Sequence, residues 1–286
     1  MDRRAFLKAA ISGILVCGSV QDALAGAFLN PPPVPNPSSD ESVYNYLKKM
    51  RNFNRPDTND IYLDAKEFEI LRSSLRRLRR VHRTVGYGNF HLVGLDDALK
   101  IARSYSRVGR FSKTELKFME WLFYEDASVY GFYGKKPLSD ITDQIPKREV
   151  VKIQGTGHYL YRGEPYELYK KIRKDVGRQA VLTSGVRSII KQTLLFLNKA
   201  KKTRGNLSMA SRSLAPPGFS YHGIGDFDIG QAGYGIANFT ERFATTKVYK
   251  RLHRLGYTKF RYNRNNLLGV RFEPWHIKVK SISANS

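Results

Sequence analysis

The sequence predicts an α+β fold, in which a helical N-terminal region precedes a domain built on a small antiparallel sheet. Two observations carry this prediction. Apolar residues recur every three or four positions in the first half, whereas short β-branched and aromatic runs separated by glycines begin near Lys147. Helical and strand patterns do not alternate regularly, and no repeat occurs. We expect four parts: a signal segment at residues 1–25, a proline-rich linker at 26–40, the helical region at 41–146 and the sheet-containing domain at 147–286.

The first 25 residues have the pattern of an export signal. Met1–Lys8 is basic, Ala9–Val20 is apolar, and Ala23-Leu24-Ala25 places small residues before a cleavage point. The apolar run is too short to span a bilayer comfortably. Arg3-Arg4 resembles a twin-arginine (Tat) signal, with an ordinary Sec signal as the alternative. We therefore expect an exported protein, located in the periplasm or cell envelope.

The chain is strongly basic, with 49 Lys and Arg against 25 Asp and Glu and a formal net charge of +24. Such a balance favours polyanionic partners. Export argues against nucleic acid and leaves anionic envelope polymers, and the basic run Arg76–Arg80 is expected to be a solvated helix face. Cys17, the one cysteine, falls within the signal, so the mature chain forms no internal disulfide. No later segment is apolar enough to be transmembrane.

The region before residue 147 contains a tether and several helical patterns. Asn30–Ser39 is rich in proline and is expected to be an extended tether. Ala65–Arg83 carries apolar residues at helical spacing. Asp96 is expected to cap a second helix, and Ser112 forms a capping box with Glu115 ahead of a third. These patterns predict a predominantly helical region over 41–146.

The region after residue 147 contains short strand patterns and two helical ones. We expect a hairpin over Val150–Tyr161, a helix from Pro165 to Val176, a strand at Val181–Thr183, a helix over Ile189–Ala200, and strands at Gly223–Ile229 and Val270–Val279 around a site.

Three segments of this half contain residues suited to a catalytic metal centre. They are Ser184–Ser188 with Gln192 beyond it, Pro217–Asp228, and Glu273–His276. A catalytic zinc site needs three protein ligands and an open position for water, and histidine and carboxylate side chains are suitable ligands. A further glutamate can accept a proton, and an arginine can stabilise an oxyanion. Taken singly, each of these residues is more often structural.

The order and the residue sequences of the three segments resemble those of the VanY-like D-alanyl-D-alanine carboxypeptidases, which are related to the VanX dipeptidases. The similarity covers about residues 150–280, and Glu-Pro-Trp-His at 273–276 is its most specific part. It implies a hedgehog/D-Ala-D-Ala peptidase-like fold. The implied roles are zinc ligands for His222, Asp228 and His276, general base for Glu273, polarisation of the scissile carbonyl for Arg187, and a substrate pocket shaped by Ser184, Gln192 and Ser220.

Two departures from the family pattern affect this assignment. Val186 stands where an aromatic residue is usual, which changes packing or pocket lining. The family places its aspartate ligand seven residues after the first histidine, whereas Asp228 follows His222 by six and Asp226 follows it by four. We expect Asp228 to be the ligand if a tight turn at Gly223–Gly225 shortens the path. Asp226 would then orient a histidine or contact substrate.

The resemblance implies hydrolysis of peptidoglycan stem peptides, most simply removal of a terminal D-alanine. An L,D-carboxypeptidase or an endopeptidase with the same site remains an alternative, as does a non-catalytic protein that binds the cell wall. The presence of Glu273 and Arg187 argues against the last alternative, because binding needs no general base. Zinc is expected, with another divalent ion left open. His82, His91, His158 and His253 match no metal segment and are expected to be structural or surface residues.

Replacing Arg3 and Arg4 together by lysine is predicted to keep the precursor in the cytoplasm, because the twin-arginine receptor reads the arginine pair. Fractionation of cells that express the tagged precursor measures this. Unimpaired export of the double variant would assign the signal to the Sec route.

Overall fold

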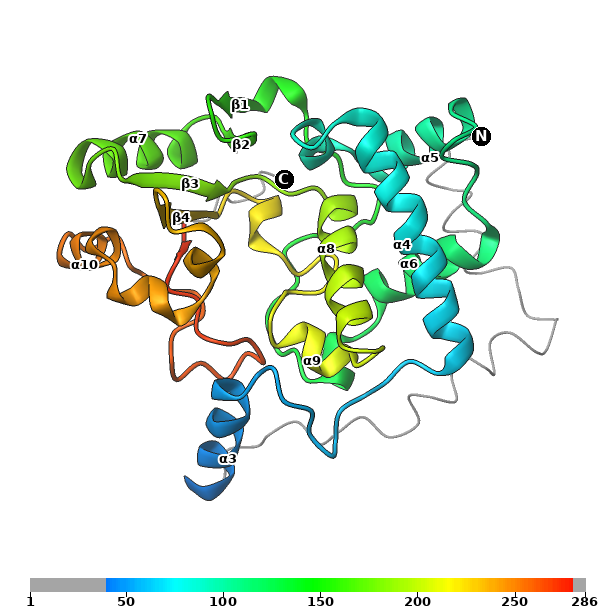
Figure 1. Ribbon diagram of the computed structural model, residues 1–286, viewed down its shortest axis with the longest axis horizontal. Helices are drawn as coiled ribbons and strands as arrows, with labels where there is room; N and C mark the ends of the chain where they lie inside the picture. The colour runs from blue at the N-terminus through cyan, green and yellow to red at the C-terminus, as the bar shows by residue number, and fades with distance from the viewer. Residues whose placement is uncertain (1–39, 280–286) are drawn as a thin grey trace.

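The computed structural model describes residues 40–279 (Figure 1). The expected signal, Cys17 and the proline-rich tether at Asn30–Ser39 lie outside these residues. The helices are α3 (Asp40–Arg51), α4 (Ala65–Val85), α5 (Leu95–Ser104), α6 (Lys113–Tyr124), α7 (Glu164–Val176), α8 (Ile189–Lys202), α9 (Leu207–Ser211) and α10 (Lys247–Arg254). The strands are β1 (Val150–Ile153), β2 (His158–Tyr161), β3 (Ala180–Ser184), β4 (Phe227–Gln231) and β5 (His276–Ile277). Short 3-10 turns include η2 (Asn89–Leu92), η5 (Tyr221–Gly223) and η6 (Gly235–Phe239).

The mixture of helices with two small antiparallel sheets confirms the α+β prediction. β1 and β2 form the expected hairpin, and the second sheet has the strand order β3-β4-β5. α7 and α10 pack against this second sheet and enclose one apolar core with it. The sheet therefore has a covered face, on which its apolar side chains are buried.

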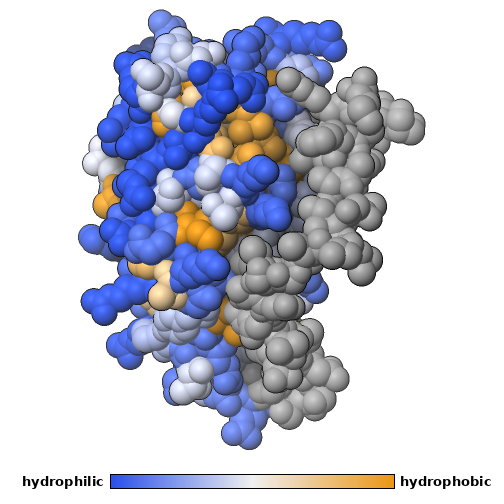
Figure 2. All heavy atoms as spheres, turned by 90° about the vertical axis from the view of Figure 1, so that its right-hand side faces the viewer, coloured by the Kyte–Doolittle hydropathy of each residue, from blue (hydrophilic) through white to orange (hydrophobic). Residues whose placement is uncertain are grey.

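Helix α4 shows why its sequence folds as it does. Asp64 accepts a hydrogen bond from the backbone N–H of Glu67, and the Glu67 side chain accepts one from the backbone of Asp64, so both form a capping box. Leu71, Leu75 and Leu78 are at most 1% exposed on one face. On the other face Arg76 and Arg80 are exposed, as expected, whereas the half-buried Arg77 pairs with the buried Glu115 at 2.7 Å. Figure 2 shows a mostly hydrophilic surface on the side of α4, α5 and α6.

Three details differ from the sequence-based expectations. Gly94, not Asp96, is the N-cap of α5, and Asp96 instead lies in the first turn, where its charge favours the helix dipole. The expected strand at Val270–Val279 is reduced to the two residues of β5, because the segment before it follows the loop around the site. The expected strand at Gly223–Ile229 begins only at Phe227.

The two halves of the chain share one apolar core. Helices α4, α5 and α6 pack with α8 and α9, and Val270 near the C-terminus belongs to the same core. Tyr46 of α3 accepts a hydrogen bond from the backbone N–H of Gly269, which ties the first helix to the last loop. The N-terminal helices thus support α8, which begins at the site. No helix within residues 40–279 is long and apolar enough to cross a membrane.

Because the core is shared, we predict that Leu78→Ala destabilises the whole molecule by about 2–5 kcal/mol, the usual cost of such a cavity. Trp121 lies in α6 and Trp275 beside the site, so the fluorescence of the two single-tryptophan proteins (each Trp→Phe) reports the two halves during urea unfolding. Both midpoints should fall together, and the exposed control Leu255→Ala should move neither. An unchanged Trp275 midpoint would show that the halves unfold independently.

Candidate metal centre and active site

The three-stranded sheet brings the expected site segments together. Asp228, on the central strand β4, lies opposite Ser184 of β3 and opposite His276 of β5. The β3–β4 register shifts between Leu182 and Ser184, which indicates a bulge at the end of β3. Segments separated by more than 40 residues in the sequence therefore converge on the side chain of Asp228.

Two histidines approach one oxygen of this carboxylate. His222 Nε2 lies 3.3 Å from Asp228 Oδ1, and His276 Nδ1 lies 3.3 Å from the same atom. All three residues are at most 3% exposed, and their ligand atoms lie within 4.8 Å of one another. Asp228 Oδ1 accepts no hydrogen bond from any residue in the range 40–279. Tetrahedral bonds of about 2.0–2.1 Å place ligand atoms roughly 3.3 Å apart, so this donor set fits a zinc-sized cation.

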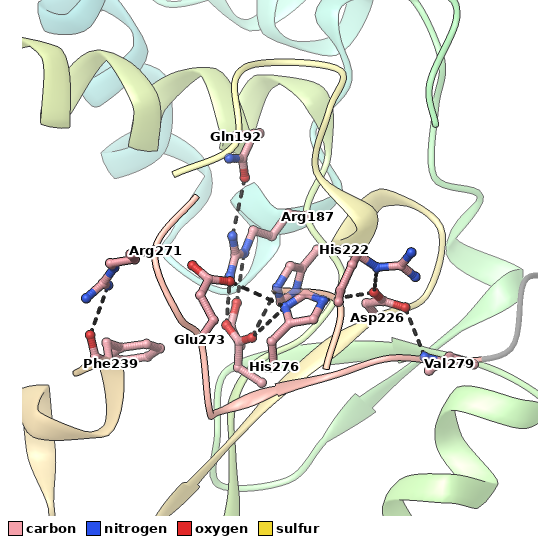
Figure 3. A network of polar contacts seen from close by, with 12 residues as sticks. Arg187, Gln192, His222, Asp226, Phe239, Arg271, Glu273, His276 and Val279 are labelled. Atoms are coloured by element: carbon pink, nitrogen blue, oxygen red, sulfur yellow. Dashed lines mark hydrogen bonds and ion pairs between the residues drawn. The ribbon is translucent and has the colours of Figure 1, made fainter. Parts of the chain in front are cut away.

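Partners behind the histidines fix which ring nitrogen faces Asp228. His222 Nδ1 lies 2.8 Å from the carbonyl oxygen of Gly185. His276 Nε2 lies 2.8 Å from Asp226 Oδ2, which also accepts a hydrogen bond from Arg261 Nε at 2.7 Å (Figure 3). Such outer contacts orient a histidine for metal binding and make it a better ligand. Asp226 therefore orients the ring of His276, one of the two roles that the sequence left open for this aspartate.

A compact turn compensates for the shortened spacing between His222 and Asp228. His222 lies in η5, and the N–H groups of Ile224 and Asp226 both donate to the carbonyl of Tyr221 at 3.1 Å. Gly225 has φ +124°, a conformation that L side chains rarely adopt. The turn tightens near Gly225, and β4 then presents Asp228 to His222.

Arg187 is held in the same cluster by three acceptors. Its Nε donates to Ser184 Oγ at 2.9 Å, its Nη1 to Gln192 Oε1 at 3.3 Å, and its Nη2 to Asp228 Oδ2 at 2.8 Å (Figure 3). Gln192 is fixed in turn, because its amide donates to the carbonyl of Ala215. Two of the expected pocket residues therefore orient the arginine.

Glu273 lies next to the histidines without joining them. Its Oε2 is 3.9 Å from His276 Nδ1, and its side chain is 13% exposed. Burial raises the pKa of the Glu273 carboxyl, an effect that nearby positive charge only partly offsets. A carboxylate with a raised pKa beside a metal position is suited to accept and return a proton.

The charges of the cluster are strongly coupled. Burial and the neighbouring Arg187 lower the pKa of His222, which keeps its ring neutral. Burial opposes ionisation of Asp228, but His222, His276 and Arg187 outweigh it and hold the pKa of this carboxyl well below its usual range. The centre thus offers an ionised carboxylate and one neutral imidazole. Burial opposes protonation of His276, but Asp226 and Asp228 outweigh it and raise the pKa of this ring to about 10, so a metal would displace a proton from it.

A cavity of about 510 Å³ opens over these groups. All eight residues expected in the site line it: Ser184, Arg187, Gln192, Ser220, His222, Asp228, Glu273 and His276. Asp226 does not line it and lies behind His276.

Several cavity residues were not expected from the sequence. His91 and His158, interpreted there as structural or surface residues, line the cavity with ring centroids 4.8 Å apart. Burial lowers the pKa of His91 to about 3 and that of His158 to about 4, so both rings are neutral. Phe53 and Asn54 also line the cavity. They follow α3 and belong to no motif, so only the folded chain reveals them.

Comparison with known proteins agrees with the motifs. Residues 164–281 match the sequence profile of the VanY family, described as D-alanyl-D-alanine carboxypeptidase. One solved structure, of the vancomycin resistance D,D-pentapeptidase VanY from a VanB-type resistance cassette (a Glu-to-Ala mutant in complex with Zn(II)), is 23% identical in sequence. That similarity covers 49% of this chain and 84% of that chain, with a TM-score of 0.36. No curated protein matches the chain. Residues 164–281, the segment that the VanY profile matches, hold every residue of the cluster.

Proposed function

We propose that this protein is an exported zinc-dependent peptidase that hydrolyses peptidoglycan stem peptides and removes a terminal D-alanine. The observation that carries the proposal is the buried Asp228 Oδ1, which two histidine nitrogens approach at 3.3 Å and which accepts no hydrogen bond within residues 40–279. Glu273 and Arg187 line the same cavity.

His222, Asp228 and His276 would hold the zinc ion. When bound, zinc supplies a polarised water and a Lewis acid for the scissile carbonyl. Since Oδ2 of Asp228 is already engaged by Arg187, Oδ1 is the oxygen left for the metal. Asp226 fixes the ring of His276, and the carbonyl of Gly185 fixes that of His222.

The remaining groups handle the proton and the developing negative charge. Glu273 accepts the proton of the attacking water and returns it to the leaving amine. Arg187, held by Ser184 and Gln192, places guanidinium N–H groups beside the carbonyl oxygen that becomes negative. Because its three acceptors fix the guanidinium in advance, little reorganisation is needed during the reaction.

Export and envelope attachment complete the proposal. The signal pattern of residues 1–25 supports delivery to the periplasm or cell envelope. The excess of basic residues supports retention near anionic envelope polymers. Incubation of the mature protein with defined muropeptides, with and without chelator, tests the proposal, because product masses distinguish D,D-carboxypeptidase from L,D-carboxypeptidase and endopeptidase cleavage.

We predict that Asp228→Ala loses zinc, because it removes the oxygen shared by both histidines. Asp226→Ala should weaken zinc affinity by only about 10–100-fold, the scale for removing a group that orients a ligand. Metal analysis after dialysis against graded chelator measures both, with circular dichroism as the control for folding. Loss of metal from the Asp226 variant combined with full retention by the Asp228 variant would reverse the two roles.

We predict that Glu273→Gln binds zinc normally but turns over at least about 10²-fold more slowly, since glutamine keeps the volume and removes the base. Hydrolysis rates at saturating pentapeptide, together with metal content, measure this. Glu69→Gln, an exposed glutamate on α4, is the matched control and should behave as wild type. Near-normal turnover of the zinc-loaded Glu273 variant would remove Glu273 from the mechanism.

A further inference from the structure

The cavity extends beyond the metal centre along one face of α8. Gln192, Leu195 and Lys199 line it at helical spacing of three and four residues. Because an α-helix rises 1.5 Å per residue, Lys199 lies roughly 10 Å along the axis from Gln192. Phe53 and Arg271 also line the cavity. A peptide bound at the metal centre therefore has room to run along α8.

Arg271 is built into this part of the cavity with an unused donor. Its guanidinium lies 4.6 Å from the ring centroid of Phe53 and 4.8 Å from that of Trp275. Its Nη2 donates to the carbonyl of Phe239 at 2.9 Å (Figure 3), whereas its buried Nε has no acceptor within residues 40–279. No carboxylate in that range lies within ion-pair distance of it. An arginine stacked on its faces presents its edge, which suits a carboxylate.

Lys199 adds a second cation beside it. Its Nζ donates to Asn54 Oδ1 at 3.1 Å and lies 5.8 Å from the ring centroid of Phe53. Burial lowers the pKa of Lys199, and the nearby positive charge of Arg271 lowers it further through electrostatic repulsion. Within residues 40–279 Lys199 has no ion-pair partner. Two like charges held together without an acid are unfavourable unless an anion joins them.

The acidic residues near Lys199 and Arg271 form no ion pair with them. Glu273 and Glu241 influence the pKa of Arg271, but neither comes within ion-pair distance of it. Glu241 is paired with Arg264 at 2.8 Å, and Glu273 lies beside the histidines of the metal centre. The charge of Lys199 and Arg271 is therefore available to a ligand in the cavity.

The N-terminal segment that supplies Phe53 and Asn54 is firmly anchored. Arg212, only 2% exposed, pairs with Asp60 and donates to the carbonyl of Arg55 at 3.0 Å. The carbonyl of Arg212 accepts the backbone N–H of Arg271 at 3.0 Å. One buried residue thus fixes both segments, the one after α3 through its side chain and the one that carries Arg271 through its backbone carbonyl.

We infer that Lys199 and Arg271 form a subsite for a free carboxylate of the peptide substrate, with Phe53 and Asn54 holding them in place. The inference rests on the proposed function, because it assumes that a peptide is cut at the metal centre. Arg271 lies two residues before Glu273 and Lys199 about 10 Å from Gln192, and an extended peptide spans about 3.3 Å per residue. The carboxylate recognised is therefore two or three residues from the scissile bond. An acidic stem peptide with a γ-linked glutamyl residue offers its α-carboxylate at this distance.

The test uses two synthetic pentapeptides, L-Ala-γ-D-Glu-L-Lys-D-Ala-D-Ala and its analogue with the glutamyl α-carboxylate converted to a carboxamide. They differ by one charge remote from the bond that is cut. Wild-type protein should prefer the carboxylate form at least about tenfold in kcat/KM, the scale of a hydrogen bond to a charged group. The preference should appear in KM, because the contact also exists in the ground state.

Arg271→Gln and Lys199→Gln should each reduce the preference towards one, because each variant loses more kcat/KM on the carboxylate peptide than on the carboxamide peptide. Arg103→Gln removes the same charge from an exposed position on α5 that does not line the cavity, and it should retain the full preference. Matching thermal unfolding curves show that each variant is folded. An indifferent wild type, or a preference that survives in both Gln variants, overturns the subsite.

Calorimetric binding of the same two peptides to the zinc-loaded Glu273→Gln variant separates this inference from the proposed function. A preference for the carboxylate in binding, without hydrolysis by the wild type, would refute the proposed reaction and support the subsite. Hydrolysis by the wild type, with equal binding of the two peptides, would refute the subsite alone.

Discussion

The position of Asp228 on the central strand of a three-stranded antiparallel sheet is the constraint on which the site depends. Its neighbours across the two ladders are Ser184 and His276, so backbone pairing fixes the spacing of the segments before any ligand binds. The two carboxylate oxygens of Asp228 have different partners: Oδ2 accepts a hydrogen bond from Arg187, and both histidines face Oδ1. Burying this many charges is costly, and the cost is offset because each group is paired or oriented by a further contact.

The N-terminal helices extend this arrangement. The shared core positions α8, whose first turn carries Gln192, one partner of Arg187, and whose far end carries Lys199. The segment after α3 closes the cavity around Phe53, anchored through the buried Arg212. The helical region is thus structurally continuous with the metal centre, although the family match begins only at residue 164.

Much of the site and part of the fold could be predicted from the sequence. Capping boxes and helical periodicity located α4 and α6, and all eight site residues that the motifs named line the cavity over the metal centre. Periodicity failed at Val270–Val279, because β-branched and aromatic residues there pack around a loop. It also gave no sign of Phe53, His91 or His158, since contacts between distant segments leave no local pattern. The sequence alone could not decide whether Asp226 or Asp228 is the ligand, because residues two apart in an extended strand place their side chains on the same face. The turn at Gly225 in the folded chain distinguishes them.

The central claim is that a metal at this centre is shared by His222 Nε2, His276 Nδ1 and Asp228 Oδ1, with Asp226 behind His276. A crystal structure of the zinc-loaded protein, with anomalous differences recorded on both sides of the zinc absorption edge, tests it most directly. We predict one anomalous peak about 2.0–2.2 Å from each of these three atoms, with Asp226 still on Nε2 of His276. A peak bonded to Asp226 and to Nε2 of His276 would contradict the account.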